Sequence, residues 1–319
     1  MKEKIKKSIK IITFLIILSF ILLTLGNKAS AIINPPIWHI GDNWHYFTNS
    51  SGNCYYTNWS EPCPYENENH LYYNITGEKT YMFNGTNISV FIVNTKSFGA
   101  GHQTEPEASY NYSFMINTTK YISKNNYSIV WEYEIANKSE VYNGVTTISW
   151  FATSITQTET TYISPEILIK YPLNIDNLWY SNYSFNYKSY EKSQLGAGPW
   201  KENWYNGTEF QNYSNYCDKQ EMIGTYDSYR IVSHSLDYPN FSPEIIWVSE
   251  YAGNYIQKIS EYDYPSNHGY SYTILMDGHY NGNTLPKVPT PTIFESSIEF
   301  ILVMMIVTTI LAFFYTKKD

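Results

Sequence analysis

The stretch from Lys79 to Val93, KTYMFNGTNISVFIV, carries a strong hairpin signal. Its centre is Asn84-Gly85, and both residues tolerate the positive φ angles that a tight two-residue turn requires. The arms on either side alternate apolar and polar residues, which is the period of a strand with two different faces. This stretch therefore predicts an antiparallel β-hairpin, with Asn84 at its turn and Asn87 on the more polar face of its second arm.

A second copy of the same strand begins at Gly224. Aligned on Gly85 and Gly224, the segments GTNISVFIV and GTYDSYRIV share five of nine positions. Upstream, IGDNWHY from Ile40 matches IDNLWY from Ile175, in the same order and at similar spacing. We interpret the pair as a duplicated β unit, with chance similarity between Asn-rich and Tyr-rich strands as the alternative.

Composition agrees with a strand-rich body. Aromatic residues make up 18% of the 319 residues, 33 of them tyrosines, and strand-forming threonine, isoleucine and valine are abundant. We expect an all-β ectodomain of antiparallel curved sheets, built from two duplicated β units, and one C-terminal transmembrane helix. The expected segments are a signal peptide (1–31), β domain 1 (32–170), β domain 2 (171–284), a proline-rich stalk (285–297), a transmembrane helix (298–316) and a cytoplasmic tail (317–319).

The N-terminal region has the pattern of a secretory signal. Lysines precede an apolar run from Ile11 to Leu25, and Ala29 and Ala31 give the small-residue spacing that a signal peptidase recognises. As a helix this run would span roughly 22 Å, less than the ~30 Å hydrocarbon core of a bilayer. We predict a cleaved signal and a mature chain from near Ile32, with an uncleaved membrane anchor as the alternative.

The C-terminal region has the pattern of a stop-transfer helix. Phe300 to Tyr315 is free of charge, and Lys317 and Lys318 follow it, which predicts a single-pass protein with a cytoplasmic C-terminus. The tail resembles the sorting signals of archaeal surface proteins in its proline-rich LPKVPTPT, its apolar helix and its basic end. IFESSIEF stands where those signals carry a motif such as P-E-F. The resemblance implies a body outside the cell, and removal of the tail, as in lipid-anchored proteins, would give the same location.

Thirteen Asn-x-Ser/Thr triplets predict a glycosylated surface protein. The candidate acceptors are Asn49, Asn58, Asn74, Asn84, Asn87, Asn111, Asn117, Asn126, Asn137, Asn182, Asn206, Asn212 and Asn240. The first hairpin holds Asn84 and Asn87, and the second copy has Ile223 and Tyr226 in their places. We therefore expect the first hairpin to face solvent and the second to pack, against its sister domain.

The three cysteines also suit an outer location. Cys54 and Cys63 bracket YYTNWSEP and predict a small disulfide loop. Cys217 is left over, and we expect a buried or idle thiol there, because no histidine and asparagine can be assigned to it as catalytic partners.

The second copy resembles a broad group of secreted and lipoprotein-type β domains from bacteria and archaea. Their pattern is P-L-x-x-G-x-x-W-x-Y, G-T-[FY]-x-x-Y-x-I and W-Y-S-x-x-x-G, and this chain has YPLNIDNLWYSNYS, GTYDSYRIV and IIWVSEYAGNYIQKISEY. Asp176 stands where glycine is usual, and Val248 where tyrosine is usual. The resemblance implies a curved antiparallel sheet without shared catalytic residues. Trp44, Trp179 and Trp247 are then expected as core anchors rather than as a sugar-binding platform.

No motif identifies a reaction, and we assign no catalytic residue, cofactor or metal. The chain has no G-x-S-x-G elbow, H-E-x-x-H, P-loop or calcium loop. In HIGDNWH, His39, Asp42 and His45 would meet at a metal only in a turn, and an ordinary strand start is the alternative. Glu132 and Glu134 share one face of a strand, which suits acid–base work on a glycan, with solvated surface residues as the alternative.

Two further stretches read as breaks between strands. FGAGHQTEPEAS, from Phe98 to Ser109, predicts a loop because of its glycines, its proline and its polar residues. YSIVWEYEIANKSEVYNG, residues 127–144, predicts two arms about a turn at Asn137-Lys138-Ser139.

These features favour a membrane-anchored extracellular glycoprotein, non-catalytic, that acts in envelope structure, in adhesion or in binding a ligand. The expected partners are the membrane and other envelope proteins or glycans. We expect no nucleic acid as a partner, because the formal net charge is −8, a field of that sign repels nucleic acid, and no basic stripe or RNA-binding motif offsets it. One alternative is a surface hydrolase acting on an extracellular polymer. The other is a module that binds a small apolar ligand in a cavity lined by tyrosine and tryptophan.

Overall fold

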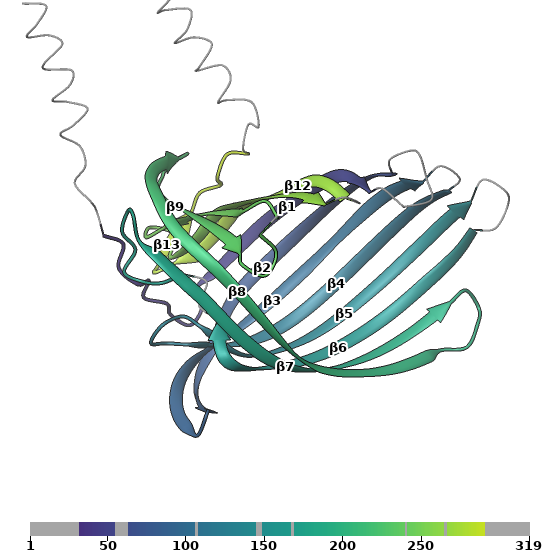
Figure 1. Ribbon diagram of the computed structural model, residues 1–319, viewed down its shortest axis with the longest axis horizontal. Coiled ribbons are helices and arrows are strands. Elements are labelled where there is room, and N and C mark those ends of the chain that lie inside the picture. The colour runs from purple at the N-terminus through teal and green to yellow at the C-terminus, as the bar shows by residue number, and fades with distance from the viewer. Residues whose placement is uncertain are drawn as a thin grey trace, which may run out of the picture.

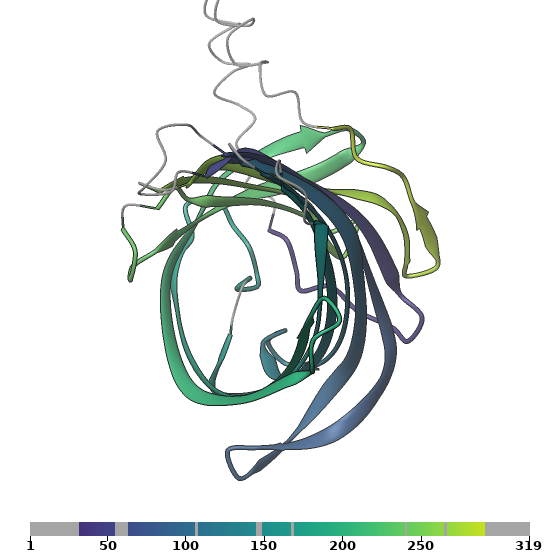
Figure 2. The same ribbon diagram turned by 90° about the vertical axis from the view of Figure 1, so that its right-hand side faces the viewer.

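The protein folds into a closed antiparallel β-barrel (Figures 1 and 2). The computed structural model describes residues 32–54, 63–105, 108–144, 149–166, 169–239, 241–264 and 267–290. Within these residues thirteen strands pair in chain order, and β1 also pairs with β12, which closes the ring. The all-β, antiparallel expectation is confirmed. The expectation of curved sheets is corrected, because the sheet closes on itself and so leaves no long free edge.

The strands are long, and each pairs with its neighbours in the chain. They are β1 (Asn43–Cys54), β2 (Cys63–Phe83), β3 (Thr86–Glu105), β4 (Ala108–Ser123), β5 (Ile129–Gly144), β6 (Ser149–Glu166), β7 (Leu178–Leu195), β8 (Lys201–Ile223), β9 (Tyr226–Ser235), β10 (Glu244–Ser249), β11 (Asn254–Tyr264), β12 (Asn267–Tyr280) and β13 (Asn283–Leu285). The short β13 pairs with the end of β12.

The wall of the barrel has an inner and an outer face because side chains alternate along each strand. In β2, Leu71, Tyr73 and Ile75 belong to the inner core, whereas Glu68 and Asn74 are exposed on the outer face. In β2 the outer face therefore meets water with charged and amide side chains. The outer faces of other strands also carry exposed apolar side chains, among them Phe98, Met115 and Phe210.

The predicted first hairpin is confirmed. Asn84 and Gly85 have φ angles of 47° and 78° and form the turn between β2 and β3, and Asn87 is exposed just beyond it. The second hairpin joins β8 to β9 and packs as expected, with Tyr226 fully buried. The segment that covers this hairpin is not the predicted sister domain but the chain after β13. The Tyr226 hydroxyl donates a hydrogen bond of 2.6 Å to the carbonyl of Pro286.

The two predicted β units share the barrel equally. Residues 32–170 supply β1 to β6 and residues 171–284 supply β7 to β12, and β6 pairs with β7 across the boundary. The starts of the two units also match in detail. Gly41 N–H donates to the carbonyl of Ile75 at 2.8 Å, and Asp176 N–H donates to the carbonyl of Cys217 at 2.7 Å. Gly41 and Asp176 both have positive φ, a backbone conformation that glycine adopts more easily than aspartate.

One end of the barrel is closed by two segments that fold across it, residues 32–42 before β1 and residues 169–177 before β7, which we call the closing segments. Ile33 pairs with Leu173, and the Trp38 indole donates to the carbonyl of Gly253 at 2.8 Å. Figure 2 looks into the opposite, open end and shows segments inside the ring at the far side. Leu285 and Val288 are buried in the core at the closed end. The predicted stalk is thus corrected in its first residues, which pack onto the barrel.

The predicted signal peptide and transmembrane helix lie outside the described residues. Among the residues that the structure does describe, none forms a helix of the length and apolar character needed to cross a bilayer. Both described ends of the chain, near residues 33 and 289, lie at the same, closed side of the barrel (Figure 1).

Candidate functional site

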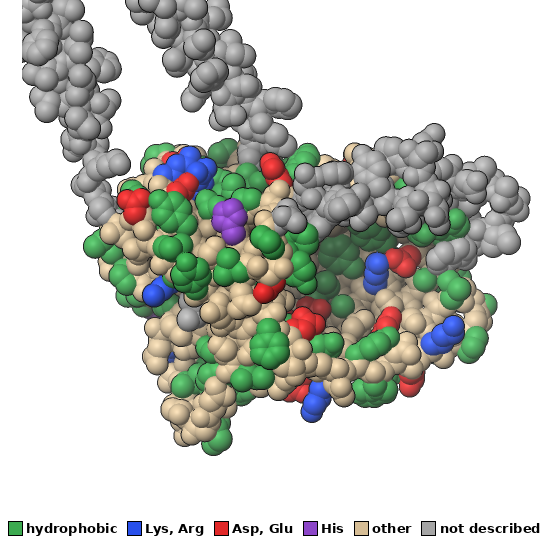
Figure 3. Space-filling view, viewed as in Figure 1, with side chains coloured by type: hydrophobic (Ala, Val, Ile, Leu, Met, Phe, Trp, Pro, Cys, Tyr) green, Lys and Arg blue, Asp and Glu red, His purple; other side chains and the backbone are tan. Residues whose placement is uncertain are grey.

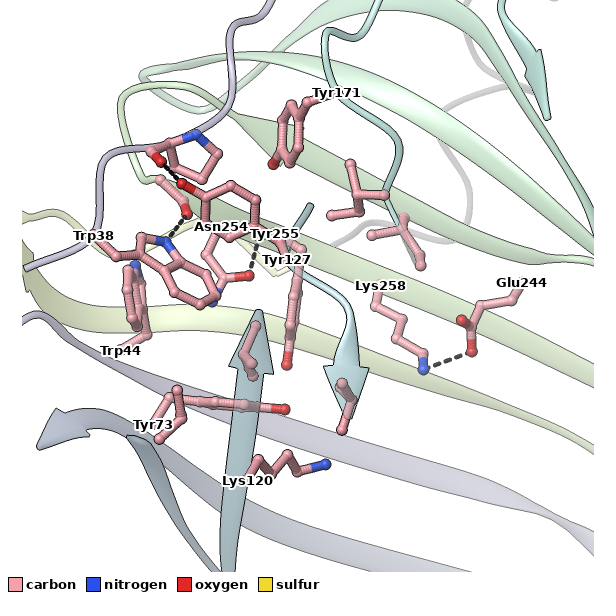
Figure 4. A pocket seen from close by; sticks show the side chains of 17 residues that line it. Trp38, Trp44, Tyr73, Lys120, Tyr127, Tyr171, Glu244, Asn254, Tyr255 and Lys258 are labelled. Atoms are coloured by element: carbon pink, nitrogen blue, oxygen red, sulfur yellow. Dashed lines mark hydrogen bonds and ion pairs between the residues drawn. The ribbon is translucent and has the colours of Figure 1, made fainter. Parts of the chain in front are cut away.

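A cavity of about 200 Å³ lies inside the barrel near its closed end. Its walls are mainly aromatic and aliphatic side chains, and three charged residues reach into it (Figure 4). The aromatic residues come from strands and from the closing segments alike: Trp38, Trp44, Tyr73, Tyr127, Tyr171 and Tyr255. The charged residues are Lys120, Glu244 and Lys258. A concave apolar space with a few polar groups is the usual form of a small-molecule site.

The aromatic wall is held rigidly by hydrogen bonds and ring contacts. The Trp44 indole donates to the carbonyl of Ala252 at 2.7 Å, which ties β1 to the β10–β11 turn. The ring of Trp38 meets that of Tyr127 edge-on, with ring centroids 5.0 Å apart. The rings of Tyr46 and Tyr255 stack with their centroids 4.4 Å apart. Such contacts fix the shape of the cavity before any ligand arrives.

Two ion pairs border the cavity on opposite parts of the wall. Lys120 of β4 pairs with Glu132 of β5 at 2.8 Å, and Lys258 of β11 pairs with Glu244 of β10 at 2.6 Å. Lys120 is directly opposite Glu132 in the strand register. Lys258 is opposite Ile246 and therefore diagonal to Glu244, on the same face of the sheet. The strand pairing itself thus brings both ion pairs together. The pairs give the apolar cavity a polar border with both signs of charge.

Glu134 lies beside the first ion pair. It faces the lumen next to Thr118, its cross-strand neighbour in β4. Burial away from water raises the pKa of Glu134, and the carboxylate of Glu132 raises it further, against the smaller opposing effects of Lys120 and Thr118. The fold therefore makes the charged form of this carboxyl less favourable than it would be in water.

We expect Glu134→Gln to raise Tm at pH 7.5 by roughly 2–4 °C, which corresponds to about 1 kcal/mol in a domain of this size. Above its raised pKa the folded protein must hold a charge that burial disfavours, so stability falls as pH rises through that pKa. At pH 4 the carboxyl is mostly protonated, and the variant should match the wild type. Thermal unfolding followed by circular dichroism at both pH values measures this, and a lower Tm for the variant at pH 7.5 would contradict it.

A second, more open cleft of about 600 Å³ continues toward the mouth of the barrel. Tyr213, Ser233, Ser260 and Glu244 line it, and Glu244 lines the aromatic cavity too. Figure 3 shows the molecule hollowed at this end, with acidic and basic side chains inside the hollow. The lumen thus has an apolar inner part and a polar outer part that meet at Glu244.

Only two of the three residues of the predicted HIGDNWH site come together: the His39 and Asp42 side chains are 3.8 Å apart, and His45 lies elsewhere. Asp42 accepts hydrogen bonds from the backbone N–H groups of His39 and Asn281, at 2.7 and 3.0 Å, and so stabilises a turn. His45 lies on the outer wall, where its ring contacts His70 and Asp277 at 3.0 Å each. Within the described part of the chain, no group of three or more His, Cys, Asp or Glu residues is placed to hold a metal.

None of the predicted glycan acceptors that the structure describes faces the lumen. Eight of them are exposed, at turns or on the outer wall: Asn74, Asn84, Asn87, Asn111, Asn117, Asn126, Asn182 and Asn206. Asn49, Asn137 and Asn212 are half-buried and also point outward by strand register. Asn58 and Asn240 lie outside the described residues. Every acceptor that the structure describes is therefore on the side that a sugar needs.

The predicted burial of Cys217 and of three tryptophans is confirmed, whereas the predicted disulfide is not tested. Cys54 and Cys63 are opposite each other in the β1–β2 register, a position that suits a disulfide, and their bond stays a prediction. Cys217 is buried as expected, and burial together with the Asp218 and Asp176 carboxylates raises the pKa of its thiol to about 12. The three predicted anchors, Trp44, Trp179 and Trp247, are all buried, which confirms their core role.

Sequence reasoning missed the residues that make the cavity. Glu132 and Glu134 do share a face, as expected, but that face is the lumen and their partner Lys120 was not identified. No periodic sequence pattern marks Trp38 and Tyr171, because they lie in segments without regular secondary structure. A search of known protein families, of characterised proteins and of solved structures gives no match to this chain, so its function has to be inferred from the barrel itself.

Proposed function

We propose that this protein is a binding barrel displayed outside the cell, which holds a small ligand with an apolar aromatic part and a polar end. The observation that carries the proposal is the aromatic cavity, because it is enclosed by the wall and bordered by two ion pairs. A barrel built only for structure would fill this space with side chains, since empty apolar space costs stability. We therefore favour a binding role over a purely structural role.

The described ends of the chain support a display role. Both lie at the closed side of the barrel, so an anchor at the C-terminus would leave the mouth pointing away from the membrane. The outward placement of all described glycan acceptors agrees with exposure to the secretory pathway. Mass spectrometry of the native protein tests this, and unmodified asparagines with an intact first 31 residues would contradict it.

Filling the cavity tests the binding role directly. We expect the full-length protein in lipid nanodiscs to bind 2-naphthol, a small aromatic probe, at one site, as measured by isothermal titration calorimetry. Ile169 lines the cavity, and Ile169→Trp should weaken this binding at least tenfold, because the larger ring occupies the space. Its matched control is Ile163→Trp, at a side chain that is exposed. The proposal fails if the wild type shows no saturable binding or if both variants bind equally.

A further inference from the structure

The first closing segment begins at Ile32, the residue at which we expect the mature chain to start. The residue after it, Ile33, is held firmly. Its backbone N–H donates to the carbonyl of Leu173 at 3.0 Å, and its carbonyl accepts from the N–H of Leu173 at 2.9 Å. Its side chain is 4% exposed and packs in a core cluster with Trp179. The backbone of Ile32 is therefore placed by a buried anchor one residue away.

A pocket of about 340 Å³ lies beside Ile32. Three parts of the chain meet there: the first closing segment, strand β9, and the end of β10 with the turn after it. The lining residues are Ile32, Ile33, Asp227, Tyr229, Ser249, Glu250 and Tyr251. Two of these residues are acidic, and none of the described lining residues is basic.

The two carboxylates in the pocket are not neutralised. The amide Nε2 of Gln220 lies 2.8 and 2.7 Å from the two oxygens of Asp227, which is a neutral partner. The Glu250 side chain is exposed and has no hydrogen-bond or ion-pair partner among the residues that the structure describes. Burial raises the pKa of the Tyr229 hydroxyl, and the acidic groups of Asp227, Cys217 and Glu250 raise it further. The pocket thus carries negative charge without a cation.

A buried hydroxyl group adds an acceptor to the same pocket. Ser249, the last residue of β10, is 1% exposed, and its Oγ atom has no hydrogen-bond partner within the described chain. Its backbone carbonyl accepts from the N–H of Gly253 at 3.0 Å, so only the side chain is unpaired. A buried polar atom without a partner costs stability. The group that suits this hydroxyl and two carboxylates together is a positively charged donor.

From these observations we infer that the pocket binds the α-ammonium group of Ile32. The inference goes beyond the proposed binding function and rests on the predicted cleavage after Ala31. Hydrolysis breaks the C–N bond between Ala31 and Ile32: the oxygen of water joins the carbonyl carbon of Ala31 as a carboxylate, and both protons of water go to the nitrogen of Ile32. The resulting ammonium group has three N–H donors, one each for Ser249 Oγ, Asp227 and Glu250.

This pairing makes removal of the signal peptide a step in completing the fold. Before cleavage the nitrogen of Ile32 belongs to a neutral amide with a single N–H, which supplies neither the charge nor the three donors. After cleavage the ammonium group joins the first closing segment to β9 and to the turn between β10 and β11. The closed end of the barrel therefore gains its last contacts only when the chain is released from its signal.

The reactivity of the amino group tests the inference directly. The chain from Ile32 to Asp319, in lipid nanodiscs at pH 7, is labelled with a trace of acetic anhydride, and acetylation of Ile32 is measured by mass spectrometry. We expect this amine to react about tenfold more slowly in the folded protein than in urea, because neighbouring carboxylates favour the charged, unreactive form. Equal rates in the folded and unfolded protein would overturn the inference.

Variants of the two carboxylates identify the partners of the amine. Asp227→Asn and Glu250→Gln should each raise the acetylation rate of folded Ile32 about threefold, because each removes one nearby negative charge. Glu261→Gln, at an exposed carboxylate of β11, is the matched control and should leave the rate unchanged. The same rate in the wild type and in both pocket variants would contradict the assignment of this pocket.

A chain that keeps Ala31 separates amine binding from ordinary packing. Its amino group lies one residue further along, and the nitrogen of Ile32 is again an amide. Ser249→Ala should lower Tm by about 2–4 °C in the chain from Ile32, where a hydrogen bond to the ammonium is lost. In the chain from Ala31 the hydroxyl is unpaired, and the same substitution should keep or raise Tm. An equal change in both chains would mean that Ser249 serves packing alone, and would overturn the inference.

The inference and the proposed binding function fail separately, because neither measurement on Ile32 uses a ligand. If the Ile32 amine is protected but 2-naphthol does not bind, the binding function is wrong and this inference stands. If 2-naphthol binds but the native protein keeps residues 1–31, the α-ammonium group does not exist and this inference is wrong.

Discussion

Trp44→Ala should lower the free energy of unfolding by about 3–5 kcal/mol, the usual cost of deleting a large buried aromatic side chain. Trp44 is 1% exposed and packs against Trp38 and Tyr280, with ring centroids 5.7 and 6.0 Å apart. Its indole also donates to the carbonyl of Ala252, and alanine would leave that buried carbonyl without its partner. Packing and hydrogen bonding are lost together, so the effect lies at the upper end for a single substitution.

Trp204→Ala is the matched control for this prediction. Trp204 is 76% exposed on β8, so its loss should change the free energy of unfolding by no more than about 0.5 kcal/mol. Urea unfolding of the full-length variants, followed by circular dichroism, compares the two directly. Similar midpoints for Trp44→Ala and the wild type would show that the closed end is not the packed core described above.

Gly278→Ala should destabilise the barrel by about 1–3 kcal/mol, because it forces an extra atom into the seam where β1 and β12 meet. Gly278 is opposite Trp44 in that seam. A Cβ at this position would lie 2.5 Å from the carbonyl oxygen of Asn43 and 3.2 Å from the Cα of Trp44. Both are backbone atoms, so the strands must separate to make room.

Gly77→Ala, in the β2–β3 pair, is the control for the seam. A Cβ there would meet only the Cδ1 atom of Ile92 at 3.6 Å, an ordinary contact. We expect its free energy of unfolding to stay within about 1 kcal/mol of the wild type, with a gain as the favoured direction. Equal Tm values for the two glycine variants would argue against close pairing of β1 with β12.

Local features of the fold could be predicted from the sequence because their causes are local. The Asn84-Gly85 turn needs only residues that tolerate positive φ, and both copies of the hairpin form where expected. The buried positions of Trp44 and Trp179 follow from their size and their place at the start of matching units. The strand type follows from alternation along the chain.

Long-range pairing could not be predicted in the same way. The stretch from Phe98 to Ser109 reads as a loop, yet β3 continues to Glu105 and β4 begins at Ala108. Asn137-Lys138-Ser139 reads as a turn, yet β5 runs straight through it. In both places neighbouring strands supply hydrogen bonds along their whole length, and partners such as Tyr112 and Phe114 fill the space at the glycines. Tertiary pairing overrides local preference there.

The site was harder to predict than the fold, because it is assembled across the ring. Lys120 and Lys258 lie on separate strands, and each looks like an ordinary surface lysine in its own segment. Only closure of β1 onto β12 turns the alternating face of every strand into one lumen. The closing segments then bring Trp38 and Tyr171 to the same cavity from regions without a periodic pattern.

Closure of the barrel is the claim on which the lumen and the proposed binding function depend, and a disulfide across the seam measures it. Thr48 of β1 and Thr273 of β12 are directly opposite, with hydroxyl oxygens 2.9 Å apart, although 225 residues separate them in the chain. We predict that the double variant Thr48→Cys/Thr273→Cys forms an intramolecular disulfide between positions 48 and 273, identified by non-reducing peptide mapping of the full-length protein. The pair Thr48→Cys/Ser235→Cys, at positions that the register does not pair, should remain reduced. Failure of positions 48 and 273 to cross-link under oxidising conditions would contradict a closed barrel.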